Sequence, residues 1–265
     1  DLCLDSQHLV EAAKARDTES YEAFLRAGPS RRTLSYALRS LCYEEPAETP
    51  GSGAEIPAAL ILDLFERTAP LATAEPARTR EETLVTEHRD HGVSGLAANN
   101  RHEIISALLQ GGQVTEAAIN DAFLNAIGCN HKESVELLLP HAGKKEIRRA
   151  FLAVAAVDND WQPPQGSRRF LVSLIDTGAV EADSLVRGAV CLSNRGAWGE
   201  KERAAALTIL NHPQFPPARL NEVLIETGLN GNAPVFEALV RNPATSSAIG
   251  KLYRAVLSKD LPGVA

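Results

Sequence analysis

The most constraining feature of the sequence is a pair of apolar series within residues 115–143. In the first series, apolar side chains follow the i, i+3, i+4, i+7, i+8 spacing that places them on one face of a helix; they are Ile119, Ala122, Phe123, Ala126 and Ile127. Thr115 precedes them and can cap the helix. A second series, ending in Leu138 and Leu139, predicts a partner helix that closes before Gly143. Because two helices cannot enclose a core alone, this hairpin predicts that the unit recurs.

The same pattern does recur along the chain. Apolar anchors of first helices follow one another at intervals that average about 31 residues; they are Val93, Ile119, Ile147, Leu185, Leu220 and Ile249. Paired apolar residues at the ends of second helices recur at nearly the same mean period; they are Leu108-Leu109, Leu138-Leu139, Leu174-Ile175, Ile209-Leu210 and Leu239-Val240. Two further hairpins are predicted before residue 66. A period in the low thirties is typical of ankyrin and tetratricopeptide repeats.

The residues favour the ankyrin class. Residues 131–138, HKESVELL, resemble the second-helix signature of ankyrin repeats, in which a His-x-Glu sequence precedes Val-x-x-Leu-Leu. Residues 100–112 resemble it again, and residues 232–242 more faintly. The Thr-Pro-Leu-His turn of the family is missing from every first helix, and the short connections leave little room for its projecting β-hairpins. The Trp, Leu-Gly, Tyr and Pro pattern of tetratricopeptide repeats does not recur.

Composition narrows the class of function. Aromatic residues make up only 5% of the chain against 44% hydrophobic residues in all, which suits closely packed helices better than a β-sandwich. The net charge of -7 argues against broad binding of nucleic acid, which requires a concentrated basic surface. No apolar run approaches the roughly 18 residues of a membrane span. We therefore expect no nucleic acid and no membrane as partners.

The N-terminus and the cysteines give indications of the compartment in which the protein acts. The sequence contains no Met, not even at position 1, so we expect a processed or trimmed N-terminus, and removal of a signal peptide is one explanation. The four cysteines have no C-x-x-C spacing and form no zinc ligand set. Free, partly buried thiols are one interpretation, and a bridge between Cys3 and Cys42 is the other.

Residues 66–92 interrupt the rhythm with two prolines and many charges. We expect an irregular inserted connection at about residues 66–92, with a short extra helix from residue 81 to 91 capped by Thr79. The connection includes the densest titratable cluster, in which Glu87, His88 and His91 could share a helix face as part of a metal site. The alternative is a solvated, charged connection.

Two other histidines, His102 and His131, lie near the starts of second helices. The ankyrin resemblance implies a structural role there, namely hydrogen bonds between neighbouring repeats. The chain has no Gly-rich phosphate loop, no Gly-x-Ser-x-Gly and no His-Glu-x-x-His, so no motif supports a nucleotide-binding protein, a serine hydrolase or a zinc protease. We therefore predict no catalytic residue, no cofactor and no metal.

A basic cluster and two loops are the candidate partner-binding features. Lys144, Lys145 and Arg148 stand at the start of a predicted helix, joined by Arg149. Positive charge there is opposed by the helix dipole, which favours a partner with negative charge over a purely structural role; a solvated face is the alternative.

The two loops lie at equivalent places in neighbouring units, at residues 158–166 and 193–200, and hold both tryptophans of the chain, Trp161 and Trp198. Exposed Trp beside an arginine such as Arg195 is a common binding anchor. The alternative is that each Trp covers the end of its own hairpin.

Taken together, these observations predict an all-α, right-handed solenoid of about seven stacked ankyrin-like helix-turn-helix repeats that spans residues 1–265 as a single domain. The resemblance implies a non-catalytic, monomeric module that binds a protein partner through its concave face and adjacent loops. The expected contacts are Trp161, Trp198, Arg195, Lys144, Lys145 and Arg148. A secreted effector that acts on host proteins and a cytosolic adaptor or inhibitor both fit, whereas a helical hydrolase or metal-dependent enzyme is the remaining alternative.

Overall fold

The computed structural model is all-helical over the residues that it describes, which are 2–43, 56–69, 79–155, 163–195 and 200–229. The described chain forms two compact units, residues 1–143 and 144–265. Within the described part no helix is long and apolar enough to cross a membrane. The expectation of one continuous array over residues 1–265 stays a prediction.

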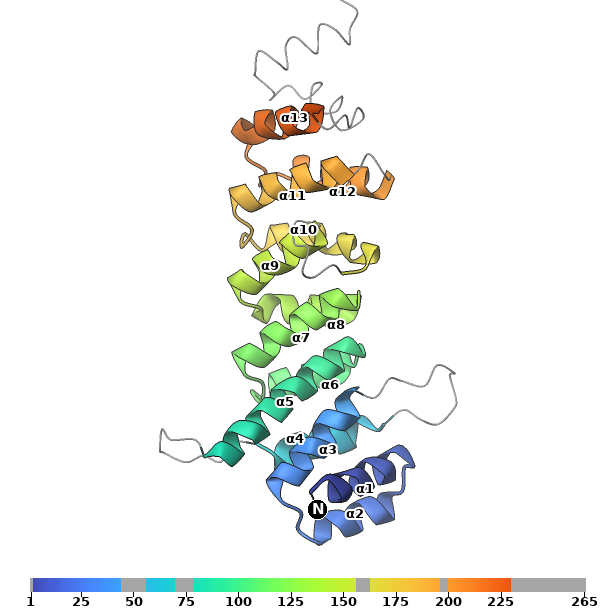
Figure 1. Ribbon diagram of the computed structural model, residues 1–265. Helices are drawn as coiled ribbons and strands as arrows, with labels where there is room; N and C mark the ends of the chain where they lie inside the picture. The colour runs from blue at the N-terminus through green and yellow to red at the C-terminus, as the bar shows by residue number, and fades with distance from the viewer. Residues whose placement is uncertain (1, 44–55, 70–78, 156–162, 196–199, 230–265) are drawn as a thin grey trace, which may run out of the picture. The chain divides into compact units, whose positions relative to one another are not determined.

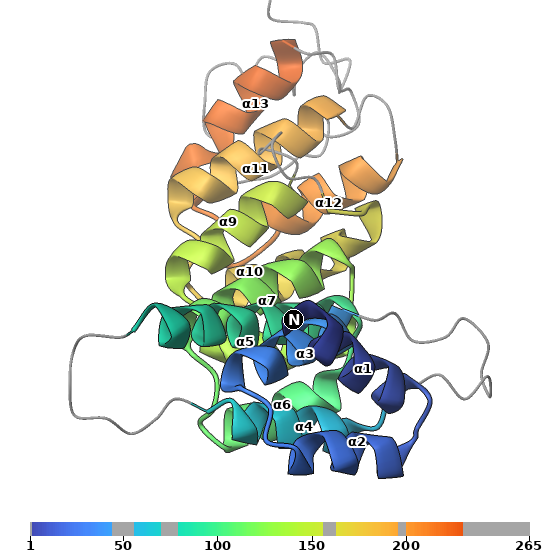
Figure 2. The same cartoon turned by 60° about the horizontal axis from the view of Figure 1, so that its bottom comes forward.

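The first unit is built from four helix hairpins. Its helices are α1 (Leu2–Lys14), α2 (Thr18–Arg26), α3 (Arg31–Tyr43), α4 (Ala58–Arg67), α5 (Arg80–Ala98), α6 (His102–Gln110), α7 (Glu116–Gly128) and α8 (Lys132–Leu138), followed by the 3-10 turn η1 (Leu139–His141). The first helices α1, α3, α5 and α7 pack on one another in order, and the second helices α4, α6 and α8 do the same. Figure 2 shows the two layers, with α1, α3 and α5 on one side of the unit and α2, α4 and α6 on the other.

The second unit follows the same rule. Its elements are α9 (Lys144–Val154), η2 (Gln165–Phe170), α10 (Leu171–Asp176), α11 (Ala182–Arg195), α12 (Glu200–Leu210), η3 (Pro217–Arg219) and α13 (Leu220–Leu229). Helix α11 packs between α9 and α13, and α10 packs on α12. Figure 1 shows these helices in chain order.

The predicted helix face in α7 is largely confirmed. Ala122, Phe123, Ala126 and Ile127 are fully buried, whereas Ile119 is half-buried and Ala118 takes its place in the core. The Thr115 cap is also confirmed, since its Oγ1 accepts a hydrogen bond of 3.1 Å from the backbone N–H of Ala118. The spacing of apolar residues thus predicts the helix and its start.

Several hairpins share the geometry of a helix end. Within the described ranges six residues adopt a positive φ, and each lies two residues beyond the last residue of its helix; they are Arg16, Asn100 and Asn130 after first helices and Gly28, Gly112 and Gly178 after second helices. The left-handed conformation at this position lets the following backbone N–H groups bond to the last carbonyls of the helix. The same turn geometry therefore recurs at six helix ends of the described chain.

In the part of residues 66–92 that the structure describes, the chain differs from the irregular connection that the sequence predicts. Helix α4 ends at Arg67, and α5 begins at Arg80 and runs without a break to Ala98. The predicted extra helix and the first helix that contains Val93 are therefore one helix of 19 residues. Thr79 and Glu82 form a capping box at its start, with Thr79 Oγ1 accepting from the N–H of Glu82 and the Glu82 carboxylate accepting from the N–H of Thr79.

Candidate functional site

The predicted basic cluster occupies the first two turns of α9. Lys144, Lys145 and Arg149 are exposed and form no ion pair within the described part of the chain. Arg148 is half-buried, and its Nη1 lies 3.2 Å from Glu181 Oε1 at the approach to α11. The cluster therefore divides into one arginine that links two helix pairs and three cations that face solvent.

The other predicted contacts are not described. Trp161 and Trp198 lie outside the described residues. Arg195 is the last residue of α11, and its side chain likewise lies outside the description. Their roles in partner binding stay predictions.

The structure corrects both interpretations of the cluster at residues 87–91. His88 and Arg89 are each only 5% exposed, so the solvated connection is wrong for these two residues. The physical reason is that α5 continues through the cluster and packs this face against α3. His88 and His91 do not share a site, because His88 is turned into the core whereas His91 is exposed and its Nδ1 lies 2.6 Å from the Glu87 carbonyl oxygen.

The environment of His88 consists of side chains from α3. Its Nδ1 lies 3.0 Å from Ser35 Oγ, and its ring packs at a tilt of 50° against that of Tyr36, with the centroids 4.2 Å apart. Ser35 Oγ donates its only proton to the Arg32 carbonyl at 2.8 Å, so the hydroxyl oxygen accepts from His88 Nδ1–H. Because Ser35 is fully buried, this Ser-His pair cannot meet a substrate and acts as a structural link between α3 and α5.

The described residues contain no group of three or more His, Cys, Asp or Glu side chains that could hold a metal ion.

Cys42 is a free, fully buried thiol, and burial raises its pKa far above the usual range. The Cys3–Cys42 bridge is therefore not formed. The side chain of Cys3 lies outside the description.

The structural role predicted for His131 is confirmed. At the start of α8, its Nε2 lies 2.8 Å from the carbonyl oxygen of Ala98 at the end of α5, in the preceding hairpin. The prediction is wrong for His102, whose Nδ1 instead contacts the carbonyl of Asn100 in its own hairpin at 3.1 Å. In this hairpin it is Arg101 that contacts the preceding hairpin, with Nη2 2.7 Å from the Ile56 carbonyl oxygen.

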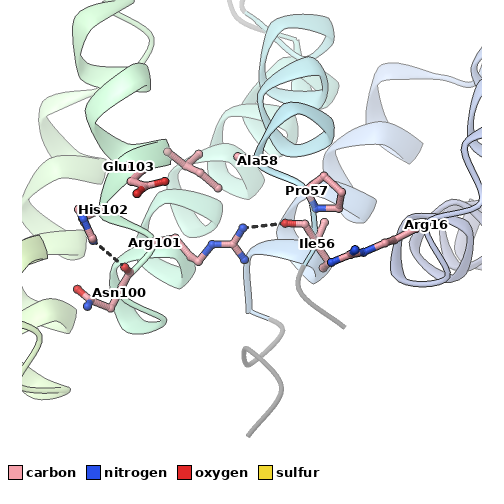
Figure 3. Close-up of a pocket in the computed structure, with 9 residues that line it drawn as sticks. Arg16, Ile56, Pro57, Ala58, Asn100, Arg101, His102 and Glu103 are labelled. Atoms are coloured by element: carbon pink, nitrogen blue, oxygen red, sulfur yellow. Dashed lines mark hydrogen bonds between the residues drawn. The ribbon is translucent and has the colours of Figure 1, made fainter. Parts of the chain in front are cut away.

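A polar cleft of about 520 Å³, not predicted from the sequence, lies beside these turns in the first unit. Figure 3 shows its lining side chains from the turn after α1, the start of α4 and the start of α6, among them Arg16, Arg101, His102 and Glu103. Neither helix start that borders it has a side-chain cap. The lining carries both signs of charge, and Arg101 already holds the backbone at Ile56. The sequence feature that could have indicated this cleft is the pair Arg16 and Arg101, which lie in equivalent turns of their hairpins.

The chain was also compared with models of known families, with curated proteins and with solved structures, and none of the three comparisons gave a match. The candidate sites consequently rest on the geometry of this chain alone.

The free energy of unfolding should decrease at acidic pH because His88 is buried in the folded chain. Burial lowers the pKa of His88 below 6.5, and the charges of Arg39, His91 and Arg32 act in the same direction against the opposing Glu87. As the pH falls below 6.5, the unfolded chain takes up a proton that the folded chain resists, so the unfolding free energy decreases. We expect His88→Asn to flatten this pH dependence in urea titrations, even if it lowers stability at every pH. His91→Asn is the control, and an equal flattening by that variant would contradict the assignment.

Proposed function

We propose that the helix hairpins are ankyrin-like repeats and that the chain is a non-catalytic module for binding a protein partner. The two layers of helices within each unit support the repeat assignment, because each hairpin contributes its first helix to one layer and its second helix to the other. Such an arrangement buries the apolar faces that a single hairpin would expose. The shared left-handed residue after the helices supports it as well.

Polar links between hairpins support the same proposal with a second, independent period. Seven of these links join residues 33 to 36 positions apart; they are His131 with Ala98, Asn100 with Glu133 and Ser134, Arg148 with Glu181, Arg168 with Glu202, Asp176 with His212, and Asp183 with Arg219. A contact that recurs at about the repeat length is expected when equivalent positions of adjacent repeats touch. This repetition in both units is the observation that carries the repeat assignment.

Protein binding is supported by the exposed cations of α9. Lys144, Lys145 and Arg149 crowd like charges at the positive end of a helix dipole and gain no ion pair in the described structure. A structural purpose does not explain this arrangement, whereas an acidic patch on a partner would. Arg148 belongs to the same surface, although its bond to Glu181 also supports the fold. The rigid packing of α9 beneath these residues keeps the ordering cost of binding low.

The test is affinity capture followed by chemical cross-linking, with the intact chain compared with two variants. Lys144→Glu with Lys145→Glu should lose the captured partner, because two attractive charges become repulsive. Arg187→Glu with Lys201→Glu changes the net charge equally at exposed sites of the same unit and should retain it. The pair Trp161→Ala and Trp198→Ala tests the predicted loops.

Equal capture by both charge variants would contradict the role of α9, and failure of the intact chain to retain any protein would contradict the proposed function. A hydrolase screen that finds turnover would favour the enzyme alternative.

A further inference from the structure

One face of α3 carries alternating arginines and tyrosines. Arg32, Tyr36, Arg39 and Tyr43 follow the i, i+4, i+7, i+11 spacing of a single helix face, here called the α3 stripe. Arg39 is exposed, Tyr43 is 44% exposed and the other two are half-buried. The apolar residues buried on the same helix are Leu34, Ala37, Leu38 and Leu41, so neither arginine of the stripe is part of the apolar core. Tyr and Arg are the residues most enriched among binding hot spots.

Two side chains of the stripe, Arg32 and Tyr36, are held in place by contacts within the protein. The Arg32 guanidinium lies over the Tyr36 ring, 5.9 Å from its centroid, and the Tyr36 ring stacks in turn on His88. His88 is fixed by its hydrogen bond with Ser35. Because a guanidinium that is already stacked loses little freedom on binding, this arrangement favours recognition of a planar anionic group.

The positive charge at the stripe is not compensated. Neither Arg32 nor Arg39 forms an ion pair with a described residue, and Arg32 Nε is a buried donor for which the described structure provides no acceptor. A cavity of about 560 Å³ opens at Arg32, and Arg80 also lines it, together with Ser30, Glu81 and Leu84. Glu81 is the one acidic residue among these lining side chains. On a chain with a net charge of -7, arginines that line a cavity and form no ion pair with a described residue are a local exception.

We propose that the α3 stripe and Arg80 form a docking surface for an acidic segment of a protein partner. Carboxylates of the segment would accept hydrogen bonds from Arg32 and Arg80 at the cavity and from Arg39 further along α3, while Tyr36 and Tyr43 supply contact area. The occupant is assigned by charge complementarity, since the surface offers donors and cations but few acceptors. The inference rests on the proposed protein-binding function and adds the chemistry of the partner at a second surface, in the first unit.

The test uses a fluorescein-labelled oligoglutamate peptide and the intact chain, with binding followed by fluorescence anisotropy. The wild-type chain should bind this peptide and not an oligolysine peptide, and its affinity should fall as salt is added. Arg32→Glu with Arg39→Glu should weaken binding by at least about tenfold. The control, Arg26→Glu with Lys132→Glu, reverses two exposed cations of the same unit and should bind as the wild type does.

Arg39→Glu alone guards against misfolding, because Arg39 is exposed; its circular dichroism should match the wild type while its affinity falls. No binding of oligoglutamate by the wild-type chain, or equal loss in the control, would overturn the inference. The proposed function is tested separately: Lys144→Glu with Lys145→Glu should abolish partner capture at α9, whereas the loss of oligoglutamate affinity caused by Arg32→Glu with Arg39→Glu should persist when these two lysines are also replaced.

Discussion

Replacing Gly95 with Ala should lower the free energy of unfolding by about 1–3 kcal/mol, the usual cost of forcing extra volume into a packed interface. Gly95 lies in the middle of α5, where this helix crosses α3. A Cβ atom added at Gly95 would stand 2.9 Å from the backbone carbonyl carbon and oxygen of Cys42 and equally close to Cδ2 of Tyr43.

The obstacle at Gly95 is backbone, which cannot turn aside as a side chain can. To admit the methyl group, α3 and α5 would have to move apart, and contacts such as the stack of Tyr36 on His88 would loosen along their length. Urea titration followed by circular dichroism measures the loss. The intrinsic preference of helices for Ala over Gly offsets it by only about 0.5–1 kcal/mol.

Gly92 provides the matched control on the same helix. A Cβ atom there would meet Cys42 Sγ and Phe65 Cζ at 3.4 Å and Leu38 Cγ at 3.7 Å, which are ordinary contacts with side-chain atoms. We therefore expect Gly92→Ala to leave stability unchanged or to raise it by about 0.5–1 kcal/mol through helix propensity. If Gly95→Ala proved as stable as Gly92→Ala, the close packing of α3 against α5 would be refuted.

This contrast shows what the sequence could and could not predict about the fold. Apolar spacing predicts most helices, because burial of one helix face leaves a period that depends only on local sequence. It fails at α5, where Gly92 and Gly95 interrupt the apolar series and charged residues precede them. There the helix depends on its capping box and on contact with α3, in which Ser35 lies 53 positions from its partner His88.

The candidate sites likewise include features that local sequence predicts and features that depend on contacts between distant residues. The cations of α9 lie within six residues of sequence, so their exposure at a helix start could be predicted. The burial of His88 could not, because its partner Ser35 is identified only once α3 and α5 are paired. The α3 stripe had a signal, the spacing from Arg32 to Tyr43, but it lies on the face opposite the apolar series that defines the helix. The roles of Trp161 and Trp198 stay predictions.

The second large effect is expected at Arg89, where replacement by Ala should lower the free energy of unfolding by about 2–4 kcal/mol. Arg89 extends from α5 into the layer of second helices, where its Nη1 lies 3.4 Å from the Thr68 carbonyl oxygen and its Nη2 3.3 Å from that of Gln113. These carbonyls follow the C-terminal ends of α4 and α6. One guanidinium thus joins the ends of two consecutive second helices, and its charge is favourable at both.

Removal of Arg89 has two costs that separate variants can distinguish. Its guanidinium lies over the Phe65 ring, 5.6 Å from the centroid, so Ala leaves a void as well as a carbonyl at Gln113 without its donor. Thr68 keeps a hydrogen bond from Arg31 at 3.0 Å. Arg89→Met fills the void without restoring the donor, so it should recover roughly half of the loss.

Arg80→Ala serves as the control for Arg89, because Arg80 is exposed on the same helix and its loss should change stability by less than about 0.5 kcal/mol. Hydrogen exchange locates the effect: Arg89→Ala should speed exchange at the ends of α4 and α6 before it does so in α7. If Arg89→Met were as stable as the wild type, packing over Phe65 would account for the whole contribution of Arg89. The joining of α4 to α6 would then depend on apolar contacts and not on the guanidinium.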